Sequence, residues 1–313
     1  MGWQSLSLLG AVRVIGLLFP GQGAQQVGMG KALAGAIPVA RDTFAEANDV
    51  LGYDVTALIF DGPVEVLVPT DICQSAILVT LVVVWRAARD AGLEGDLVMG
   101  HSLGEFSALV ASGSLPFDVA LRIVAERGAA MHAAGQEQPG TMAALLGLTD
   151  LEAEALCTAA GDVWPANYNC PGQVVASGSL DGIKRLLDLA AARGHKATPL
   201  AVGGAFHSPL MAAAAARLGP ALDAWTPREP DPAFFSTTTV AVEGSDRLRQ
   251  VIFDQLLSPV RFGASIEAAM DRGVTRFVEM GPGRVLSGLV KRINREVPTM
   301  QIQTPDDLAK VLA

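Results

Sequence analysis

The chain has 313 residues, half of them hydrophobic and 18% charged, which excludes an intrinsically disordered protein because a sizeable core can form. The formal net charge of −9, from 23 basic and 32 acidic residues, argues against general nucleic-acid binding. An acidic protein partner would therefore need a local basic patch on this surface.

Residues 1–10 are mildly apolar but lack a basic n-region and a clear cleavage site, so we interpret residues 1–12 as an extension rather than a signal peptide. The longest apolar run, residues 76–85, is shorter than the roughly 20 residues that span a bilayer, and we interpret it as a buried core helix. We expect no membrane association. The absence of a CxxC pair among the cysteines predicts a reducing, cytoplasmic compartment; they are Cys73, Cys157 and Cys170.

Predicted strands and helices alternate in the first part of the chain. Residues 13–19 are a predicted strand that ends at Pro20, and residues 71–91 are the strongest helical pattern. Residues 96–100 then read as a short buried strand that leads through a turn into a helix near Leu103. This alternation favours a mostly parallel sheet covered on both faces.

The middle of the chain has a different order, strand-helix-strand-strand-helix-strand, which is that of a ferredoxin-like unit. The six predicted elements are residues 141–148, 150–160, 163–169, 173–179, 181–193 and 196–202. We therefore predict a ferredoxin-like subdomain over residues 139–202. It is inserted into a larger, hydrolase-like α/β domain built from residues 1–138 and 203–313.

Alternation resumes after the insertion. A helix is predicted to start at Ser208 and Pro209, since serine suits the N-cap and proline the first helical position. Further strands are predicted at residues 233–238 and 275–280. The last predicted elements are two helices, residues 284–295 and 306–312.

The sharpest chemical signal is Gly-His-Ser-Leu-Gly at residues 100–104, a G-x-S-x-G motif between a predicted strand and helix. A tight turn there would lift the hydroxyl of Ser102 clear of the strand and leave no room for side chains at the glycine positions. The helix that follows offers free backbone N–H groups to an oxyanion. The motif therefore makes Ser102 a candidate nucleophile, although an ordinary strand-turn-helix would have the same pattern.

A serine nucleophile needs a base at neutral pH. His207 lies in a loop after a glycine pair and just before a helix, a position where catalytic side chains collect in α/β proteins. The other histidines are more typical of packing or of the surface; they are His101, His132 and His195. Since no acid stands out as a third member, a main-chain or amide carbonyl could orient the imidazole.

Two further positions are ambiguous when they are judged alone. Gln22, between two glycines after the first strand, could supply an oxyanion N–H or simply belong to a βα turn. Arg127, on an otherwise apolar helical stretch, could pair with Glu126 or another acid, or could bind a ligand carboxylate in a bidentate fork.

Taken together, the motifs resemble those of bacterial malonyl-CoA:acyl carrier protein transacylases and of the acyltransferase domains of fatty-acid and polyketide synthases. They include FPGQGAQ at residues 19–25, GHSLGEF at 100–106, AERGAAM at 125–131 and GAFHS at 204–208. Further collinear matches are PGTMAALLGL at 139–148, ANYNCPGQVVASG at 166–178, QLLSPV at 255–260 and EMGPGR at 279–284.

The resemblance implies a role for each matching position. It makes Ser102 the nucleophile and His207 its base, and it places the oxyanion on the backbone N–H groups of Gln22 and Leu103. Arg127 would bind the malonyl carboxylate. Two other matching residues are Gln255, whose carbonyl would orient the histidine, and Phe206, which would crowd an α-methyl group and favour malonyl over methylmalonyl.

The implied reaction moves malonyl from malonyl-CoA to the phosphopantetheine thiol of acyl carrier protein, for fatty-acid biosynthesis, with no cofactor and no metal. A polyketide synthase or malonate decarboxylase system would use the same motifs. A serine esterase is a second hypothesis, and a non-catalytic carrier-docking module is a third. We expect a monomer, with the carrier docked on basic residues near the cleft between the domains: Lys184, Arg185, Lys196, Arg284 and Lys291.

Overall fold

The computed structural model describes residues 14–313, so the proposed extension at residues 1–12 lies outside the described part of the chain. A six-stranded sheet has the order β10-β9-β1-β2-β7-β8. All neighbours pair in parallel except β7 and β8, which are antiparallel. The strands are β1 Val14–Phe19, β2 Leu97–Gly100, β7 Ala233–Ser236, β8 Ala241–Val242, β9 Val274–Met280 and β10 Thr299–Ile302.

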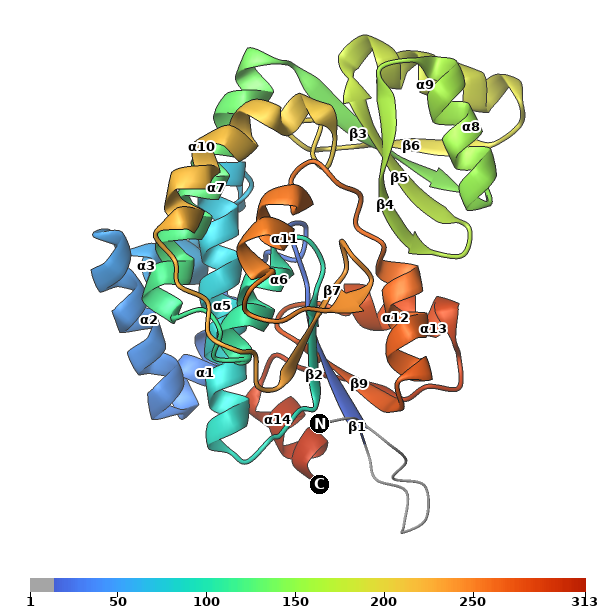
Figure 1. Ribbon diagram of the computed structural model, residues 1–313. Helices are drawn as coiled ribbons and strands as arrows, with labels where there is room; N and C mark the ends of the chain where they lie inside the picture. Colours follow the sequence, from blue (N-terminus) through green and yellow to red (C-terminus); the bar gives the residue numbers. More distant parts are fainter. Residues whose placement is uncertain (1–13) are drawn as a thin grey trace.

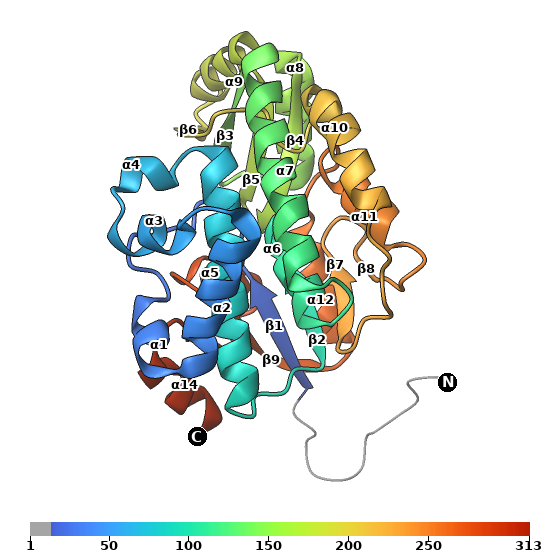
Figure 2. The ribbon, with the colours of Figure 1, turned by 90° about the vertical axis from the view of Figure 1, so that its left-hand side faces the viewer.

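Alternate residues of each central strand bury themselves on opposite faces of this sheet. Leu17 and Val98 belong to one core cluster, whereas their neighbours Leu18 and Met99 belong to another. The first face is covered by α5 (Thr70–Asp90) and α6 (Gly104–Ala111), and α2 (Pro38–Leu51) and α7 (Phe117–Glu137) pack against α5; the four helices are seen together in Figure 2. The second face is covered by α12 (Phe262–Asp271) and α13 (Val285–Ile293), on the right of Figure 1.

Helix α5 contains the apolar run that was predicted to be a core helix. It is long and apolar enough by composition to cross a membrane, but 83% of its most apolar window is buried inside the protein. It packs between α2 and α7, which explains why nearly all its faces are apolar. Burial within the protein accounts for the composition of this helix.

A second, four-stranded sheet lies at the top of Figure 1 and is entirely antiparallel. Its order, β4-β5-β3-β6, is the strand order of a ferredoxin-like unit. Its helices α8 (Asp150–Ala160) and α9 (Leu180–Ala192) cover one face. The strands are β3 Gly140–Leu146, β4 Val163–Cys170, β5 Gln173–Ser179 and β6 Lys196–Leu200.

The predicted fold class, a large α/β domain with a mostly parallel sheet and a small inserted unit, is therefore confirmed. The exact domain boundaries, 1–138, 139–202 and 203–313, stay a prediction. The remaining elements are α1 Lys31–Ala36, α3 Val55–Asp61, α4 Val64–Leu67, a 3-10 turn Pro209–Met211, α10 Ala212–Asp223, α11 Leu248–Gln255 and α14 Pro305–Leu312.

Several predicted boundaries differ from the structure by a few residues, and two of these differences have an identifiable local cause. The helix expected at Ser208 begins as a 3-10 turn, with the Ser208 hydroxyl accepting from the N–H of Leu210, and α10 follows it. The strand expected over residues 233–238 ends at Ser236, because the N–H of Thr237 leaves the sheet ladder and donates to the carboxylate of Glu105. A buried side chain thus sets this boundary, and no local pattern could predict it.

The predicted carrier-docking residues do not form one patch. Lys184 and Arg185 lie on α9, which covers the face of the small sheet opposite to the one facing the large domain. Arg185 donates to the carbonyls of Ala160 and Gly161, which connects α9 to the C-terminal end of α8. The prediction that Lys184 and Arg185 belong to a patch at the cleft is therefore wrong. The sequence pattern identified helix α9 but not the face of the small sheet that this helix covers.

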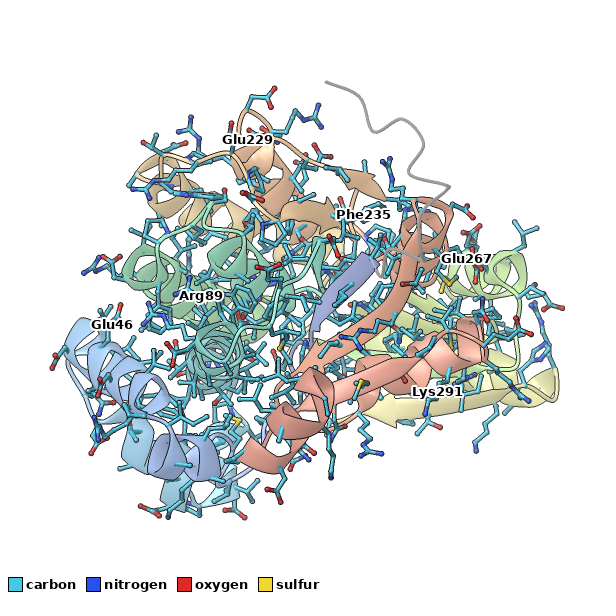
Figure 3. The ribbon with its side chains drawn as sticks, turned by 90° about the horizontal axis from the view of Figure 1, so that it is seen from below. Glu46, Arg89, Glu229, Phe235, Glu267 and Lys291 are labelled. Carbon is cyan, nitrogen blue, oxygen red and sulfur yellow. The ribbon has the colours of Figure 1, made fainter. Side chains whose placement is uncertain are left out.

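Of the other basic candidates, Lys196 lies on β6 of the small sheet, whereas Arg284 and Lys291 lie together on the large domain. Arg284 and Lys291 line a hollow of about 210 Å³ with Lys310. Lys291 is exposed on α13, with its side chain at the periphery of the molecule in Figure 3, whereas Phe235 lies in the interior. A docking role for this smaller group stays a prediction.

Candidate active site

Ser102 lies in the turn between β2 and α6 and has a left-handed backbone, with φ of 52°. A Cβ at Gly100 would lie 2.0 Å from the backbone nitrogen of Glu105, and one at Gly104 would lie 1.9 Å from the carbonyl oxygen of Phe19. Both glycines are therefore sterically required. The strained serine stands at the carboxyl end of the sheet, as a nucleophile elbow requires.

The loop after β1 packs directly on this turn. The N–H of His101 donates to the carbonyl of Phe19 at 3.0 Å, and a Cβ at Gly21 would lie 2.4 Å from the carbonyl oxygen of His101. Within residues 14–313, the backbone N–H groups of Gln22 and Leu103 donate to no protein acceptor. Leu103 directly follows the serine, and Gln22 follows Gly21, which packs on the turn, so both N–H groups are candidates for binding an oxyanion.

His207 reaches the serine from the loop after the small sheet. Its Nε2 lies 2.7 Å from the Oγ of Ser102. Its Nδ1 lies 2.9 Å from the carbonyl oxygen of Gln255 and 3.1 Å from that of Ser258. Because carbonyls only accept, they hold the proton on Nδ1 and leave Nε2 free to take the serine proton. His207 also has a left-handed backbone, with φ of 58°.

Burial of the ring, followed by the nearby positive charge of Arg127, lowers the pKa of His207 to about 3. The imidazole is consequently neutral, and able to act as a base, well below neutral pH. If the pair of Ser102 and His207 is catalytic, we expect the pH profile of kcat/KM to show no acid limb from a histidine between about pH 5.5 and 8. An acid limb near the ordinary histidine pKa would contradict this.

The lowered pKa of His207 also makes the free energy of unfolding depend on pH, so stability has to be measured together with the pH profile of the rate. In the unfolded chain His207 takes up a proton as the pH falls through its ordinary pKa, whereas in the folded protein it stays neutral. This difference favours the unfolded state at low pH. The contribution of His207 to the free energy of unfolding is therefore fully present above the ordinary histidine pKa and is lost as the pH falls below it. Circular dichroism across the pH range should therefore accompany the rates, to separate acid unfolding from titration of the base.

Arg127 is buried, with 1% of its surface exposed, although it lies on α7 among apolar residues. Its Nη1 donates to the Oε1 of Gln74 at 2.6 Å. Its Nη2 lies 3.2 Å from the Oγ of Ser102 and 3.1 Å from the Oε1 of Gln255. Within residues 14–313 it forms no ion pair, with Glu126 or with any other acid. A buried guanidinium beside the nucleophile is thus held only by neutral groups.

Comparison with known proteins fits this geometry. Residues 17–305 match the family model described as acyl transferase domain. The chain belongs to the acyl transferase family. A malonyl CoA-acyl carrier protein transacylase of Bacillus subtilis is 43% identical over 304 residues, covering 94% of this chain and 95% of the relative. The Escherichia coli protein of the same name is 38% identical, covering 94% and 97%.

Solved structures of acyl transferases agree with the sequence relatives. An acyl carrier protein S-malonyltransferase from Vibrio cholerae has a TM-score of 0.92 at 39% identity, covering 95% of this chain and 99% of the other. A malonyl-transacylase in complex with the acyl-carrier protein of a type II polyketide synthase has a TM-score of 0.92 at 38% identity, covering 96% and 99%.

The structure of this acyl transferase also contains site residues that sequence reasoning missed. Gln74 and Glu105 are fully buried and contact Arg127 directly or through Gln255. The available signal was a polar residue in an otherwise apolar helical stretch. His101, whose pKa is lowered by burial, has its Nε2 2.9 Å from the Oδ1 of Asn169 on the small sheet.

Phe206 is buried in the core beside the small sheet, in the same cluster as Met142 and Val175. A Cβ at Gly204 would lie 2.8 Å from its ring, so the glycine makes room for the phenyl group. The role of this ring in crowding an α-methyl group stays a prediction.

Among residues 14–313, no group of three histidine, cysteine or acidic side chains is arranged to hold a metal ion.

Proposed function

We propose that this acyl transferase moves a malonyl group from malonyl-CoA to the phosphopantetheine thiol of acyl carrier protein, in fatty-acid biosynthesis. The names of its relatives support the overall reaction, and the complex of a related malonyl-transacylase with an acyl-carrier protein supports the partner. The residues at the site support a ping-pong reaction through a malonyl-Ser102 ester, and we propose that this reaction needs neither a metal nor a cofactor.

In the first half-reaction the Oγ of Ser102 attacks the thioester carbonyl while the Nε2 of His207 takes its proton, across the 2.7 Å contact. The carbonyl oxygen becomes an oxyanion, which the free N–H groups of Gln22 and Leu103 stabilise. The carbon–sulfur bond then breaks, and the thiolate of coenzyme A receives the proton from the imidazolium. The product is the malonyl-Ser102 ester.

The second half-reaction reverses these roles. The carrier's thiol gives its proton to the Nε2 of His207 as its sulfur attacks the ester carbonyl, and the same N–H groups receive the oxyanion. The carbon–oxygen bond to Ser102 breaks, the serine regains its proton, and malonyl leaves on the carrier. The carbonyls of Gln255 and Ser258 keep the imidazole in the required tautomer through both steps.

The observation that carries the malonyl assignment is Arg127. Its guanidinium lies 3.2 Å from the serine oxygen, is buried, and forms no ion pair with any carboxylate of residues 14–313. A neutral ester would give such a group no charge to bind, whereas the free carboxylate of malonate can accept from it in a fork. The esterase hypothesis therefore leaves this residue without a purpose.

The test is mass spectrometry of the intact protein after incubation with malonyl-CoA in the absence of carrier. We expect the mass to rise by one malonyl group, located on the peptide that contains Ser102, and to return to its starting value when holo acyl carrier protein is added. Ser102→Ala should acquire no adduct. A folded wild-type protein without an adduct would favour the non-catalytic docking module.

The same chemistry would serve a polyketide synthase or a malonate decarboxylase system, so the assignment to fatty-acid biosynthesis rests on the names of the relatives, and the genomic neighbourhood of the gene would test it. A second measurement separates an esterase from a transferase. Hydrolysis of malonyl-CoA in the absence of carrier should be much slower than transfer in its presence. A monomeric state and a cytoplasmic location stay predictions.

A further inference from the structure

Glu105 is a fully buried acid that the reaction above does not use. It lies in the first turn of α6, three residues after the nucleophile. Its Oε1 accepts from the N–H of Thr237 at 2.6 Å and from the Thr237 hydroxyl at 2.9 Å. Its Oε2 accepts from the Nε2 of Gln255 at 2.5 Å. An acid buried in this way needs a reason, since burying a charge is costly.

These contacts favour the ionised carboxylate. Each oxygen faces an N–H group, and a backbone or amide N–H can only donate. Burial raises the pKa of Glu105, whereas the hydrogen bonds from Thr237, Gln255 and Ser236 act in the opposite direction. The environment of Glu105 is thus built from donors on both sides.

Gln255 connects this carboxylate to the arginine. While its Nε2 donates to Glu105 and, at 3.1 Å, to the carbonyl oxygen of Ser102, its Oε1 accepts from the Nη2 of Arg127 at 3.1 Å. A flipped amide would place two donors against each other at Arg127 and two acceptors at Glu105. One amide group therefore separates a buried negative charge from a buried positive charge, with its orientation fixed at both ends.

We propose that Glu105 is a positioning residue that acts through the side chain of Gln255 to hold the Arg127 guanidinium and to balance its charge without touching it. The inference rests on the proposed carboxylate-binding role of Arg127. A carboxylate in direct contact would compete with the substrate for the guanidinium, and no counter-charge at all would leave a costly buried cation. The amide between them avoids both problems.

The state of the guanidinium agrees with this arrangement. Within the described residues its Nε is buried without an acceptor, and Gln74 and Gln255 are neutral partners. The burial of Arg127 lowers its pKa to about 10, while the charge of Glu105 opposes that shift. Glu105 thus supports the charged guanidinium across the intervening amide.

Glu105→Gln is the variant that tests the proposal, because it keeps the shape and removes the charge. The substitution replaces one carboxylate oxygen by an NH₂ group. Each oxygen of Glu105 already faces an N–H donor, that of Thr237 or that of Gln255, so the NH₂ group meets another donor in either orientation. The backbone N–H cannot turn, so the side chain of Gln255 has to flip or withdraw. Either change removes an acceptor from Arg127.

We expect Glu105→Gln to lower kcat/KM for malonyl-CoA by about 10- to 100-fold, mainly through KM, the loss typical of a hydrogen bond to a charged group. Acetyl-CoA has no free carboxylate, so the fold-decrease in kcat/KM for acetyl transfer should be at least ten times smaller than that for malonyl transfer. A crystal structure of the variant should show the Gln255 amide displaced and the guanidinium moved from its place beside Ser102.

Glu279→Gln is a matched control, because Glu279 is also a fully buried carboxylate that accepts from backbone N–H groups, those of Leu286 and Ser287. This variant should lower the melting temperature without changing the ratio of malonyl to acetyl transfer. If Glu105→Gln behaves in the same way, with both substrates equally affected or neither affected, the positioning role is wrong.

Should Glu105→Gln fail to fold, the exchange E105Q/Q255E decides, since the amide at 105 can then donate to a carboxylate at 255. We expect this protein to fold and to transfer acetyl, but to bind malonyl poorly because Arg127 now pairs directly with an acid. An exchange variant that keeps the wild-type preference for malonyl over acetyl would overturn the proposal. If wild type forms no malonyl-Ser102 adduct, the proposed function fails instead, and the guanidinium position in the variant crystal structure still tests Glu105.

Discussion

Arg127→Ala is expected to lower kcat/KM for malonyl transfer by about 100- to 1,000-fold, while transfer from acetyl-CoA rises relative to malonyl. The size follows from removing one member of a buried, hydrogen-bonded charge pair, formed here with the substrate carboxylate. Steady-state rates with both thioesters, measured at several concentrations, check this. An unchanged preference for malonyl would contradict carboxylate binding by Arg127.

Arg127→Lys is the matched control for charge alone. Lysine keeps the positive charge but loses the planar fork of N–H donors, so we expect an intermediate malonyl rate. The alanine variant also leaves the Oε1 atoms of Gln74 and Gln255 without their donor. Its melting temperature should therefore be measured, so that a loss of stability is not taken for a loss of recognition.

His207→Ala is expected to slow both half-reactions by about 100- to 10,000-fold, the contribution typical of a positioned general base. The Oγ of Ser102 loses the acceptor 2.7 Å away, and Arg127 cannot replace it because a guanidinium only donates. Rapid-quench measurement of malonyl-Ser102 formation checks the first half-reaction directly.

His132→Ala provides the corresponding control. His132 is exposed on α7, the helix that also carries Arg127, and its ring contacts the side chain of Gln136. The control should retain the wild-type rate. Wild-type rates in the His207 variant would show that another group activates the serine.

Much of this site could be predicted because its residues belong to short motifs. The G-x-S-x-G turn specifies its own geometry, since the Cβ contacts at Gly100 and Gly104 admit only glycine. The helix and strand order of the small unit followed from alternation and turn residues. Proximity in space could not be predicted in this way: Ser102 and His207 are 105 positions apart, and only the folded sheet places them in contact.

The hydrogen-bond network of Glu105, Gln255 and Arg127 could not be predicted from local sequence patterns, for a different reason. Glu105 occupies an early helical position, where an acid commonly interacts with the helix dipole and faces solvent. Its burial depends on Thr237 and Gln255, which come from distant segments. Likewise, α9 was predicted correctly as a helix, but the side on which it covers the small sheet was not, so Lys184 and Arg185 were wrongly placed at the cleft.

The small sheet interrupts the chain between Arg127 and His207, yet its two ends lie together. A Cβ at Gly135 would lie 2.3 Å from the carbonyl oxygen of Gly203, and one at Gly140 would lie 2.6 Å from the Cβ of Ala205. The chain thus leaves the large domain and returns to it at adjacent points, so the small unit is an insertion whose two ends lie close together. Because both junctions lie at one place, changes within the small unit need not displace the segments that carry Arg127 and His207.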